Sequence, residues 1–194
     1  MSNSAYTIIG LAGYPGAGKK VVASRLEHVH GFWRLAFADP LYEGLATLLN
    51  LAAADIATGR KDEVLPQVGK SVRQVLDEYG EWVRAKLGSN ALIVRLEERM
   101  HATAKYGHTD AFVITDVHRD DEVAWIRAQG GAIWWVARTA HHEDDLRTAA
   151  LQALHQRCNR PEDAYVFNDS QDAHLAVQVD RRIEERLAVE FAAP

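Results

Sequence analysis

The segment at residues 13–20, GYPGAGKK, constrains the fold of this chain more than any other part of the sequence. Its spacing, GxxxxGK, is that of a phosphate-binding loop. Glycines let the backbone curl so that successive N–H groups point inward at phosphate oxygens, and the next helix adds the positive end of its dipole. The Lys19 ammonium in this pattern binds the β- and γ-phosphates of a nucleotide. The predicted nucleotide contacts are Gly13, Tyr14, Pro15, Gly16, Ala17, Gly18, Lys19, Lys20 and Val21.

The pattern departs from its usual form directly after the lysine. Ser or Thr normally follows, and its hydroxyl is a ligand of Mg²⁺. Here Lys20 and Val21 follow Lys19, and neither carries a hydroxyl. The loop therefore predicts phosphate binding strongly and metal binding poorly.

The flanking sequence fits the strand and the helix that such a loop needs. Residues 6–11 form a short apolar run with β-branched side chains, and Val22, Leu26 and Val29 recur afterwards at helical spacing. The alternative interpretation is a glycine-rich turn with no ligand. The matching flanks favour the phosphate loop over that turn.

Strand-like runs and helical patterns alternate along the chain. The apolar runs are residues 6–11, 32–37, 111–115, 132–136 and 164–167. This alternation predicts an α/β fold with a five-stranded, mostly parallel sheet. Because such sheets bind ligands at the carboxyl ends of their strands, polar residues after the runs are candidate site residues. They are Asp39, Asp116, Arg138 and Asn168.

Two long gaps separate these runs, and we interpret residues 1–194 as one domain with two insertions. Residues 39–110 are too many for a simple crossover and predict an inserted helical subdomain. Residues 139–161 are polar and charged, which is typical of a lid over a phosphate loop.

The first insertion contains two arginines within one helical pattern. Gly80 interrupts this pattern, so it is a predicted helix boundary that would let Arg73 and Arg84 converge. The alternative is that both arginines are surface charges paired with Asp77 and Glu81 at helical spacing.

Composition excludes some classes of function. The net charge is −5, and the 47% hydrophobic and 25% charged fractions are those of an ordinary globular protein. A negative chain without a recognised binding motif argues against nucleic acid as a partner. One cysteine, Cys158, excludes an intramolecular disulfide framework and fits a reducing compartment. We expect no membrane partner and a cytoplasmic location, since no apolar run reaches transmembrane length and no signal-peptide pattern is present.

Further sequence blocks accompany the phosphate loop. They are FADPL at 37–41, RQVL at 73–76 with GEWVR at 80–84, VITDV at 113–117 followed by Asp121-Glu122, HE at 142–143 and FND at 167–169. In their order and spacing, over nearly the whole chain, these blocks resemble the bacteriophage deoxynucleoside monophosphate kinases, a branch of the P-loop kinases. The resemblance implies a three-layer sandwich with a monophosphate-binding helical insertion and a short lid. It also implies a location in the host cytoplasm if the chain is phage-encoded, and it allows a homodimer.

The resemblance implies ATP-dependent phosphorylation of a deoxynucleoside monophosphate (dNMP) to the diphosphate, with Mg²⁺. The implied catalytic residues are Lys19, Arg73 and Asp116, and Asp116 would orient Mg²⁺ or its waters. The implied acceptor contacts are Asp39, Tyr42, Arg73, Asp77, Trp82 and Arg84. The lid candidates for neutralising transition-state charge are Arg147, Arg157 and Arg160, of which Arg147 is also an implied ATP contact.

Some of these assignments have alternatives. Asp39 precedes Pro40, so its role is either at the site or as a helix N-cap. His118 stands where the family has an arginine after Asp-Val, with Arg119 next to it, which leaves that arginine's role open. The acidic and histidine residues at 141–145 lack metal-ligand spacing and are better explained as solvated charge. Two functions compete with the dNMP kinase: a kinase of dephospho-coenzyme A, and a nucleotide-binding protein that has lost catalysis.

Overall fold

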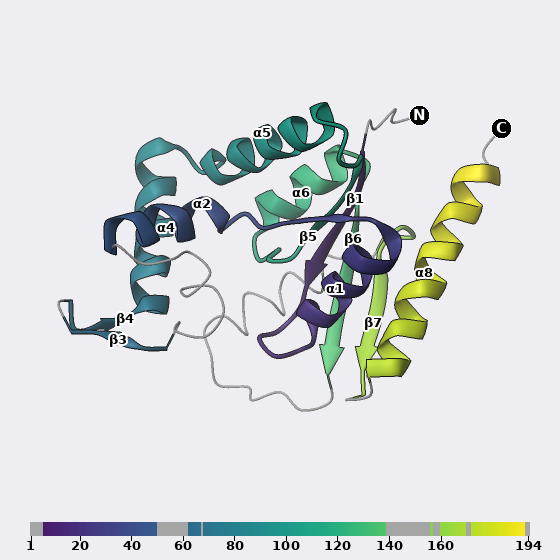
Figure 1. Cartoon of the computed structure of the whole chain (residues 1–194), viewed down its shortest axis with the longest axis horizontal. Helices are drawn as coiled ribbons and strands as arrows, with labels where there is room; N and C mark the ends of the chain where they lie inside the picture. Colours follow the sequence, from purple (N-terminus) through teal and green to yellow (C-terminus); the bar gives the residue numbers. More distant parts are fainter. Residues whose placement is uncertain are drawn as a thin grey trace. The chain divides into compact units, whose positions relative to one another are not determined.

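The computed structural model describes residues 6–49, 62–66, 68–138, 156, 160–169 and 172–192. These residues fall into two compact units (Figure 1), the first made of Met1–Leu35 and Ala102–Pro194 and the second of Ala36–His101. The insertion boundaries 39–110 stay a prediction. Most of the predicted lid at 139–161, with Arg147 and Arg157, lies outside the described residues.

A five-stranded sheet runs through the first unit. Its strands are β1 (Thr7–Ala12), β2 (Trp33–Leu35), β5 (Ala111–Ile114), β6 (Ala132–Arg138) and β7 (Ala164–Asn168). They lie in the order β2-β5-β1-β6-β7, and every neighbouring pair is parallel. Ile9 of β1 lies opposite Val113 of β5 and Ala132 of β6. The predicted α/β fold with five strands is confirmed.

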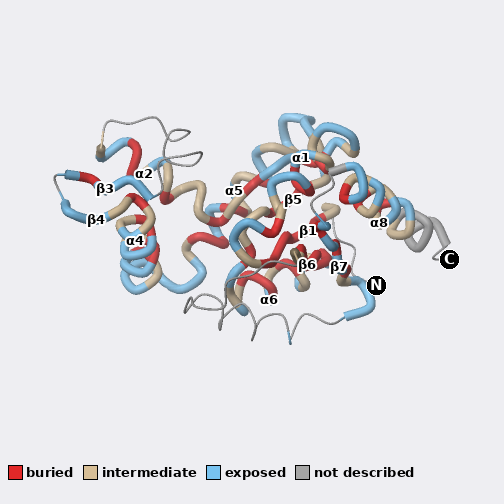
Figure 2. Tube along the Cα trace, turned by 90° about the horizontal axis from the view of Figure 1, so that it is seen from below, coloured by how far each residue is buried: buried red, intermediate tan, exposed pale blue. Residues whose placement is uncertain are grey.

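Helices cover both faces of this sheet. They are α1 (Lys19–His30), α6 (Asp120–Ala128) and α8 (Asp172–Ala192). On one face, Ile9 packs in a buried cluster with Leu26 of α1 and Val179 of α8. On the other face, a Cβ on Gly10 would lie only 2.6 Å from Cδ1 of Ile126, so α6 packs tightly there. Figure 2 shows buried residues along the strands of this sheet.

The second unit is mainly helical. Its elements are α2 (Asp39–Leu49), β3 (Val64–Leu65), β4 (Lys70–Ser71), α4 (Val72–Leu87) and α5 (Ala91–Lys105), whose last residues belong to the first unit. α4 starts at a capping box, in which Ser71 N donates to Gln74 Oε1 at 2.9 Å and Gln74 N donates to Ser71 Oγ at 3.3 Å. The sequence thereby fixes where α4 begins.

The predicted helix boundary at Gly80 is wrong, because α4 is continuous through it. Gly80 is buried, and a Cβ there would lie 3.1 Å from Cδ1 of Leu41 on α2. Glycine lowers helix stability by about 1 kcal/mol relative to alanine, but here it permits the close approach of α2. Arg73 and Arg84 therefore stay on one helix, about 16 Å apart along its axis.

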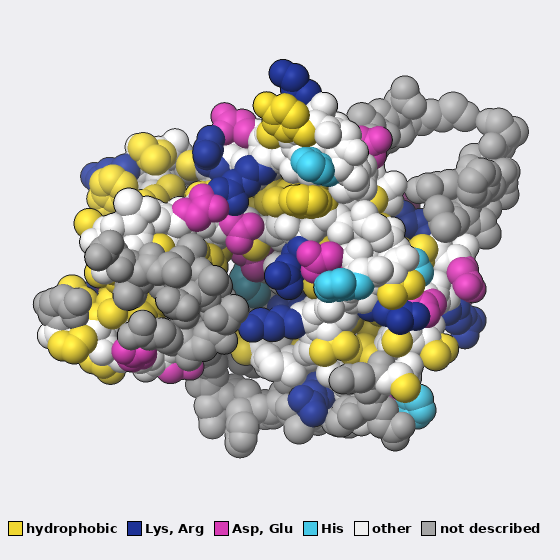
Figure 3. Space-filling model, in the orientation of Figure 1, with side chains coloured by type: hydrophobic (Ala, Val, Ile, Leu, Met, Phe, Trp, Pro, Cys, Tyr) yellow, Lys and Arg dark blue, Asp and Glu magenta, His cyan; other side chains and the backbone are white. Residues whose placement is uncertain are grey.

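The surface carries charges of both signs. On the face shown in Figure 3, Lys and Arg side chains are interspersed with Asp and Glu side chains. Of the helices in the described part of the chain, none combines the length and the apolar composition needed to cross a membrane.

Candidate functional site

The phosphate loop lies between β1 and α1 and has the backbone that its glycines allow. Gly13, Gly16 and Gly18 have φ values of 134°, 78° and 106°, in the region that L side chains rarely adopt. Ala17 N donates to Tyr14 O at 3.2 Å, which closes a turn inside the loop. A curled loop that ends at the first residue of a helix is the form in which backbone N–H groups bind anions.

Lys19 is folded back onto this loop. Its Nζ donates to Gly13 O at 2.5 Å and to Tyr14 O at 2.9 Å. Burial lowers the pKa of Lys19 from 10.5 to about 8, and the nearby charge of Asp116 acts in the opposite direction. The ammonium is thus partly desolvated, next to one carboxylate and beside the predicted phosphate position.

Asp116 lies just after β5, and a buried carboxylate holds the loop that follows it. Glu122 of α6 is only 4% exposed, and its Oε2 accepts hydrogen bonds from His118 N at 2.8 Å and Arg119 N at 3.0 Å. Val117 N donates to Leu11 O at 3.2 Å, which ties the same loop to β1. In the sequence, Glu122 is noted only as part of the block that follows VITDV. In the structure, its hydrogen bonds hold the backbone of the segment after Asp116.

Asn168, at the end of β7, forms a hydrogen bond with the phosphate loop. It is 5% exposed, and its Nδ2 donates to Ala17 O at 3.0 Å. A Cβ on Gly18 would lie 2.3 Å from the same Nδ2, so only glycine fits beside this amide. Asn168 was a candidate site residue because it follows a predicted strand, but its contact with the phosphate loop was not predicted.

The protein groups near Lys19 fit a Mg²⁺ site poorly. Among the described residues, no three His, Cys, Asp or Glu side chains cluster in a way that would hold a metal ion. Asp116 is the carboxylate whose charge acts on Lys19, and Lys20 occupies the position of the usual hydroxyl ligand. An ammonium repels a metal ion, so we assign no protein-built Mg²⁺ site here. Asp116 as a metal ligand stays a prediction.

The second unit holds the predicted acceptor residues, and it brings three of them together. Arg73 forms an ion pair with Asp62, with Nε–Oδ1 at 2.9 Å. The hydrogen bond to Asp62 raises the pKa of Arg73, and the charge of Asp77 and the Tyr42 phenol act in the same direction. Arg73, Asp77 and Tyr42 therefore form one polar group on α4 and α2.

Arg84 lies on the same side of α4 as Arg73. Eleven residues make about three full turns, so the two side chains leave the helix in nearly the same direction. The Arg84 side chain is only 18% exposed and pairs with Glu81 at 3.4 Å. A Cβ on Gly80 would lie 3.1 Å from Arg84 Nη1, which shows that the guanidinium folds back over Gly80, one turn nearer the start of the helix. Gly80 thus lies between the two arginines on the same side of α4, one turn before Arg84 and two turns after Arg73.

Trp82 lies outside this group, and Asp39 is one helical turn before Tyr42 on α2. Trp82 is nine residues from Arg73, which places it on the opposite side of α4, where it is 55% exposed and stacks on Tyr79 with ring centroids 6.4 Å apart. Asp39 begins α2, and its Oδ2 accepts a hydrogen bond from Ala36 N at 2.9 Å. This donor lies three residues before Asp39, whereas an N-cap side chain accepts from an N–H two or three residues after it, so this bond is not that of the predicted N-cap. Arg99, which the sequence did not point to, lies 3.8 Å from that carboxylate.

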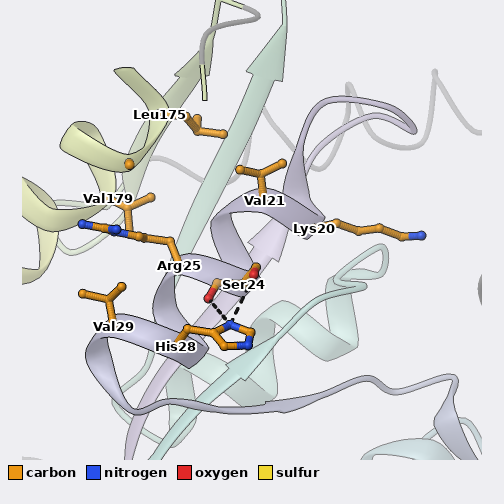
Figure 4. A pocket seen from close by; sticks show the side chains of 9 residues that line it. Lys20, Val21, Ser24, Arg25, His28, Val29, Leu175 and Val179 are labelled. Atoms are coloured by element: carbon orange, nitrogen blue, oxygen red, sulfur yellow. Dashed lines mark hydrogen bonds between the residues drawn. The ribbon is translucent and has the colours of Figure 1, made fainter. Parts of the chain in front are cut away.

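A groove of about 450 Å³ lies between α1 and α8 (Figure 4). It is lined by Lys20, Val21, Ser24, Arg25, His28, Val29, Leu175, Ala176 and Val179. Arg25 is engaged by Asp180, with Nε–Oδ1 at 2.9 Å and Nη2–Oδ2 at 2.6 Å, and His28 Nδ1 lies 2.8 Å from Ser24 O. The polar side chains in the middle of the groove are therefore committed to the packing of α1.

No protein-family model matches the sequence, and no curated protein is significantly similar to it. Among solved structures, dephospho-CoA kinase from Campylobacter jejuni superimposes with a TM-score of 0.52 and 14% identity, covering 92% of this chain and 96% of that one. Shikimate kinase from Bacteroides thetaiotaomicron gives 0.50 and 14%, covering 94% and 98%. The chain has the P-loop kinase fold. Neither neighbour is a deoxynucleoside monophosphate kinase, so that narrower resemblance stays a prediction.

Proposed function

We propose that the protein is an ATP-dependent kinase that phosphorylates a small acceptor bearing a phosphate group, with a dNMP as the favoured acceptor. The observation that carries this proposal is the Lys19 ammonium, held at 2.5 and 2.9 Å on two carbonyls of the phosphate loop and next to Asp116. Phosphoryl transfer needs positioning and charge neutralisation more than covalent chemistry from the protein. This loop offers both.

The residues of the first unit would act on the donor. Loop N–H groups and the N-terminus of α1 would hold the β- and γ-phosphates, and Lys19 would move from the carbonyls to the transferring phosphoryl group. Asn168 and Glu122 would keep the loop and the Asp116 segment in place during this change, through the hydrogen bonds described above. When bound with the nucleotide, Mg²⁺ would supply further neutralisation of phosphate charge.

The residues of the second unit would act on the acceptor. Arg73 and Arg84 project on one side of α4, and an arginine guanidinium can bind a phosphate through two parallel hydrogen bonds. Because the arginines start about 16 Å apart, Arg84 approaches Arg73 only by folding back over Gly80. Asp77 and Tyr42, which act electrostatically on Arg73, are then the neighbours that would orient sugar or base.

Dephospho-coenzyme A is the second candidate acceptor, because the neighbour from Campylobacter jejuni is a dephospho-CoA kinase. A protein that binds ATP without transferring its phosphate is the third, because the loop lacks its hydroxyl.

The experiment that separates these functions measures ADP formation with ATP, Mg²⁺ and one acceptor at a time. The acceptors are each dNMP, the ribonucleoside monophosphates, dephospho-coenzyme A and shikimate. We expect turnover with at least one dNMP. Turnover only with dephospho-coenzyme A would establish the second candidate, and ATP binding without turnover on any acceptor would establish the third.

Replacing Gly80 with alanine is expected to weaken acceptor binding selectively. The added methyl would lie 3.1 Å from both Arg84 Nη1 and Leu41 Cδ1, so the guanidinium must move. Alanine also favours the helix by about 1 kcal/mol, which offsets the crowding and keeps the protein folded. We expect KM for the acceptor to rise about tenfold, which corresponds to the loss of roughly one charge-assisted hydrogen bond. KM for ATP is expected to stay unchanged. Equal changes in both KM values would contradict a specific role for Gly80.

Nucleotide affinity is expected to fall as the pH rises above about 8. The pKa of Lys19 in the free protein is about 8, and bound phosphate would favour the protonated ammonium. Binding then takes up a proton at alkaline pH, and affinity falls by up to about tenfold per pH unit. The stability of the free protein changes in the opposite direction. Between pH 8 and 10.5, Lys19 is protonated in the unfolded chain but has lost its proton in the folded protein, so the free energy of unfolding rises with pH.

Calorimetric titration of ATP in two buffers of different ionisation enthalpy measures this proton uptake directly. An identical heat in both buffers at about pH 9 would show that Lys19 does not take up a proton on binding.

A further inference from the structure

Lys20, the residue that replaces the hydroxyl of the phosphate loop, lies where a positive charge is unfavourable in the free protein. It is the second residue of α1, directly after Lys19, and the first turn of α1 has no acidic residue. The N-terminus of a helix carries the positive end of its dipole, so a cation there costs about 0.3–1 kcal/mol. An anion bound at the loop would reverse the sign of this interaction.

The Lys20 side chain is not committed to other contacts in the described part of the chain. It is exposed, and no hydrogen bond or ion pair joins it to another described residue. Figure 4 shows it extended away from Leu175 and Val179 of α8, at the end of α1 that adjoins the phosphate loop. Arg25, one and a half turns further along α1, is instead held by two oxygens of Asp180. Of these two cations on α1, Lys20 is the one left for a ligand.

The Lys20 ammonium also explains why the protein groups near Lys19 fit a Mg²⁺ site poorly. A Ser or Thr at this position acts on phosphate indirectly, by holding the metal ion that bridges the phosphate oxygens. A lysine cannot hold the metal, but it carries positive charge itself and can bind the same oxygens as a point charge. With an anion bound at the loop, Lys19, Lys20 and the helix N-terminus would together supply the charge neutralisation that the usual loop obtains in part from the metal ion.

We propose that the Lys20 ammonium replaces the metal-ligating hydroxyl and contacts nucleotide phosphate directly, so that this loop binds metal-free ATP nearly as well as the Mg²⁺ complex. The proposal rests on the proposed function only in taking a nucleotide as the ligand. It concerns binding and assigns Lys20 no part in the transfer step.

The test measures the dissociation constant of ATP with Mg²⁺ and with EDTA, by calorimetry on the full chain. The variants are Lys20→Ser, which restores the hydroxyl, and Lys20→Ala, which removes the charge alone. Lys105→Ser is the matched control, since Lys105 is an exposed lysine in the last turn of α5. We expect removal of Mg²⁺ to weaken ATP binding less than about threefold in the wild type and in Lys105→Ser, but about tenfold or more in Lys20→Ser. Lys20→Ala is expected to bind ATP about tenfold more weakly than the wild type in EDTA.

Each other outcome has a definite meaning. If EDTA weakens ATP binding equally in the wild type and in Lys20→Ser, the replacement of metal by Lys20 is overturned while the kinase proposal stands. If the wild type binds no ATP even with Mg²⁺, the proposed function fails and this inference with it. Thermal unfolding of every variant shows whether it is folded, and Lys20→Ala provides the comparison in EDTA if Lys20→Ser does not fold.

Discussion

Replacing Lys19 with alanine is expected to lower kcat/KM for phosphoryl transfer by about a hundredfold to a thousandfold. Lys19 is already at the loop, bonded to Gly13 O and Tyr14 O, so binding a nucleotide requires only that its ammonium exchange carbonyls for phosphate. Its partial desolvation strengthens that interaction, because charge interacts more strongly where water is excluded. Steady-state ADP formation with the best acceptor, together with the dissociation constant of ATP, measures the effect.

The matched control for this experiment is Lys105→Ala. It makes the same change in net charge at an exposed position in the last turn of α5. We expect the control to retain wild-type kinetics and both variants to unfold at temperatures within a few degrees of the wild type. An active Lys19→Ala protein would mean that the loop is not the donor site, whatever the fold.

The sequence was sufficient for the sheet and the phosphate loop because both depend on local patterns. A parallel strand covered on both faces is apolar at nearly every position, so β5 and β6 could be read as short continuous runs. The loop needs glycines at fixed spacing because positive φ values recur there, and the structure has them at Gly13, Gly16 and Gly18. In each case the signal lies within a few residues of the element that it predicts.

The errors and omissions arise from contacts between residues far apart in the chain. Gly80 resembled a helix boundary because the pattern alone does not show that Leu41 packs against it. The buried stripe of α4 runs through Val72, Leu76, Gly80 and Val83, so Gly80 is itself a member of the stripe that it was expected to interrupt. The hydrogen bond from Asn168 to Ala17 joins residues that are 151 positions apart in the sequence. Such partners become visible only when the fold brings them together.

Replacing Gly13 with alanine is expected to destabilise the protein by about 3–5 kcal/mol and to abolish measurable ATP binding. A Cβ at this position would lie 2.2 Å from the carbonyl oxygen of Val136 and 3.2 Å from its carbonyl carbon. Val136 belongs to buried β6, whose backbone is held by hydrogen bonds with its neighbours, so it cannot move aside as a flexible side chain would. The loop must shift instead, which displaces the Gly13 carbonyl that binds Lys19.

Gly16→Ala separates steric overlap from backbone strain, because the two glycines share a left-handed conformation but not their surroundings. Gly16 has φ 78°, yet no heavy atom lies within 4 Å of its would-be Cβ. The alanine there costs only the conformational strain, about 1–2 kcal/mol. Denaturant unfolding of both variants measures the difference. If both lose the same stability, positive φ alone explains the glycines; if Gly13→Ala loses about 2 kcal/mol more, close packing of the loop on β6 fixes its shape before any nucleotide binds.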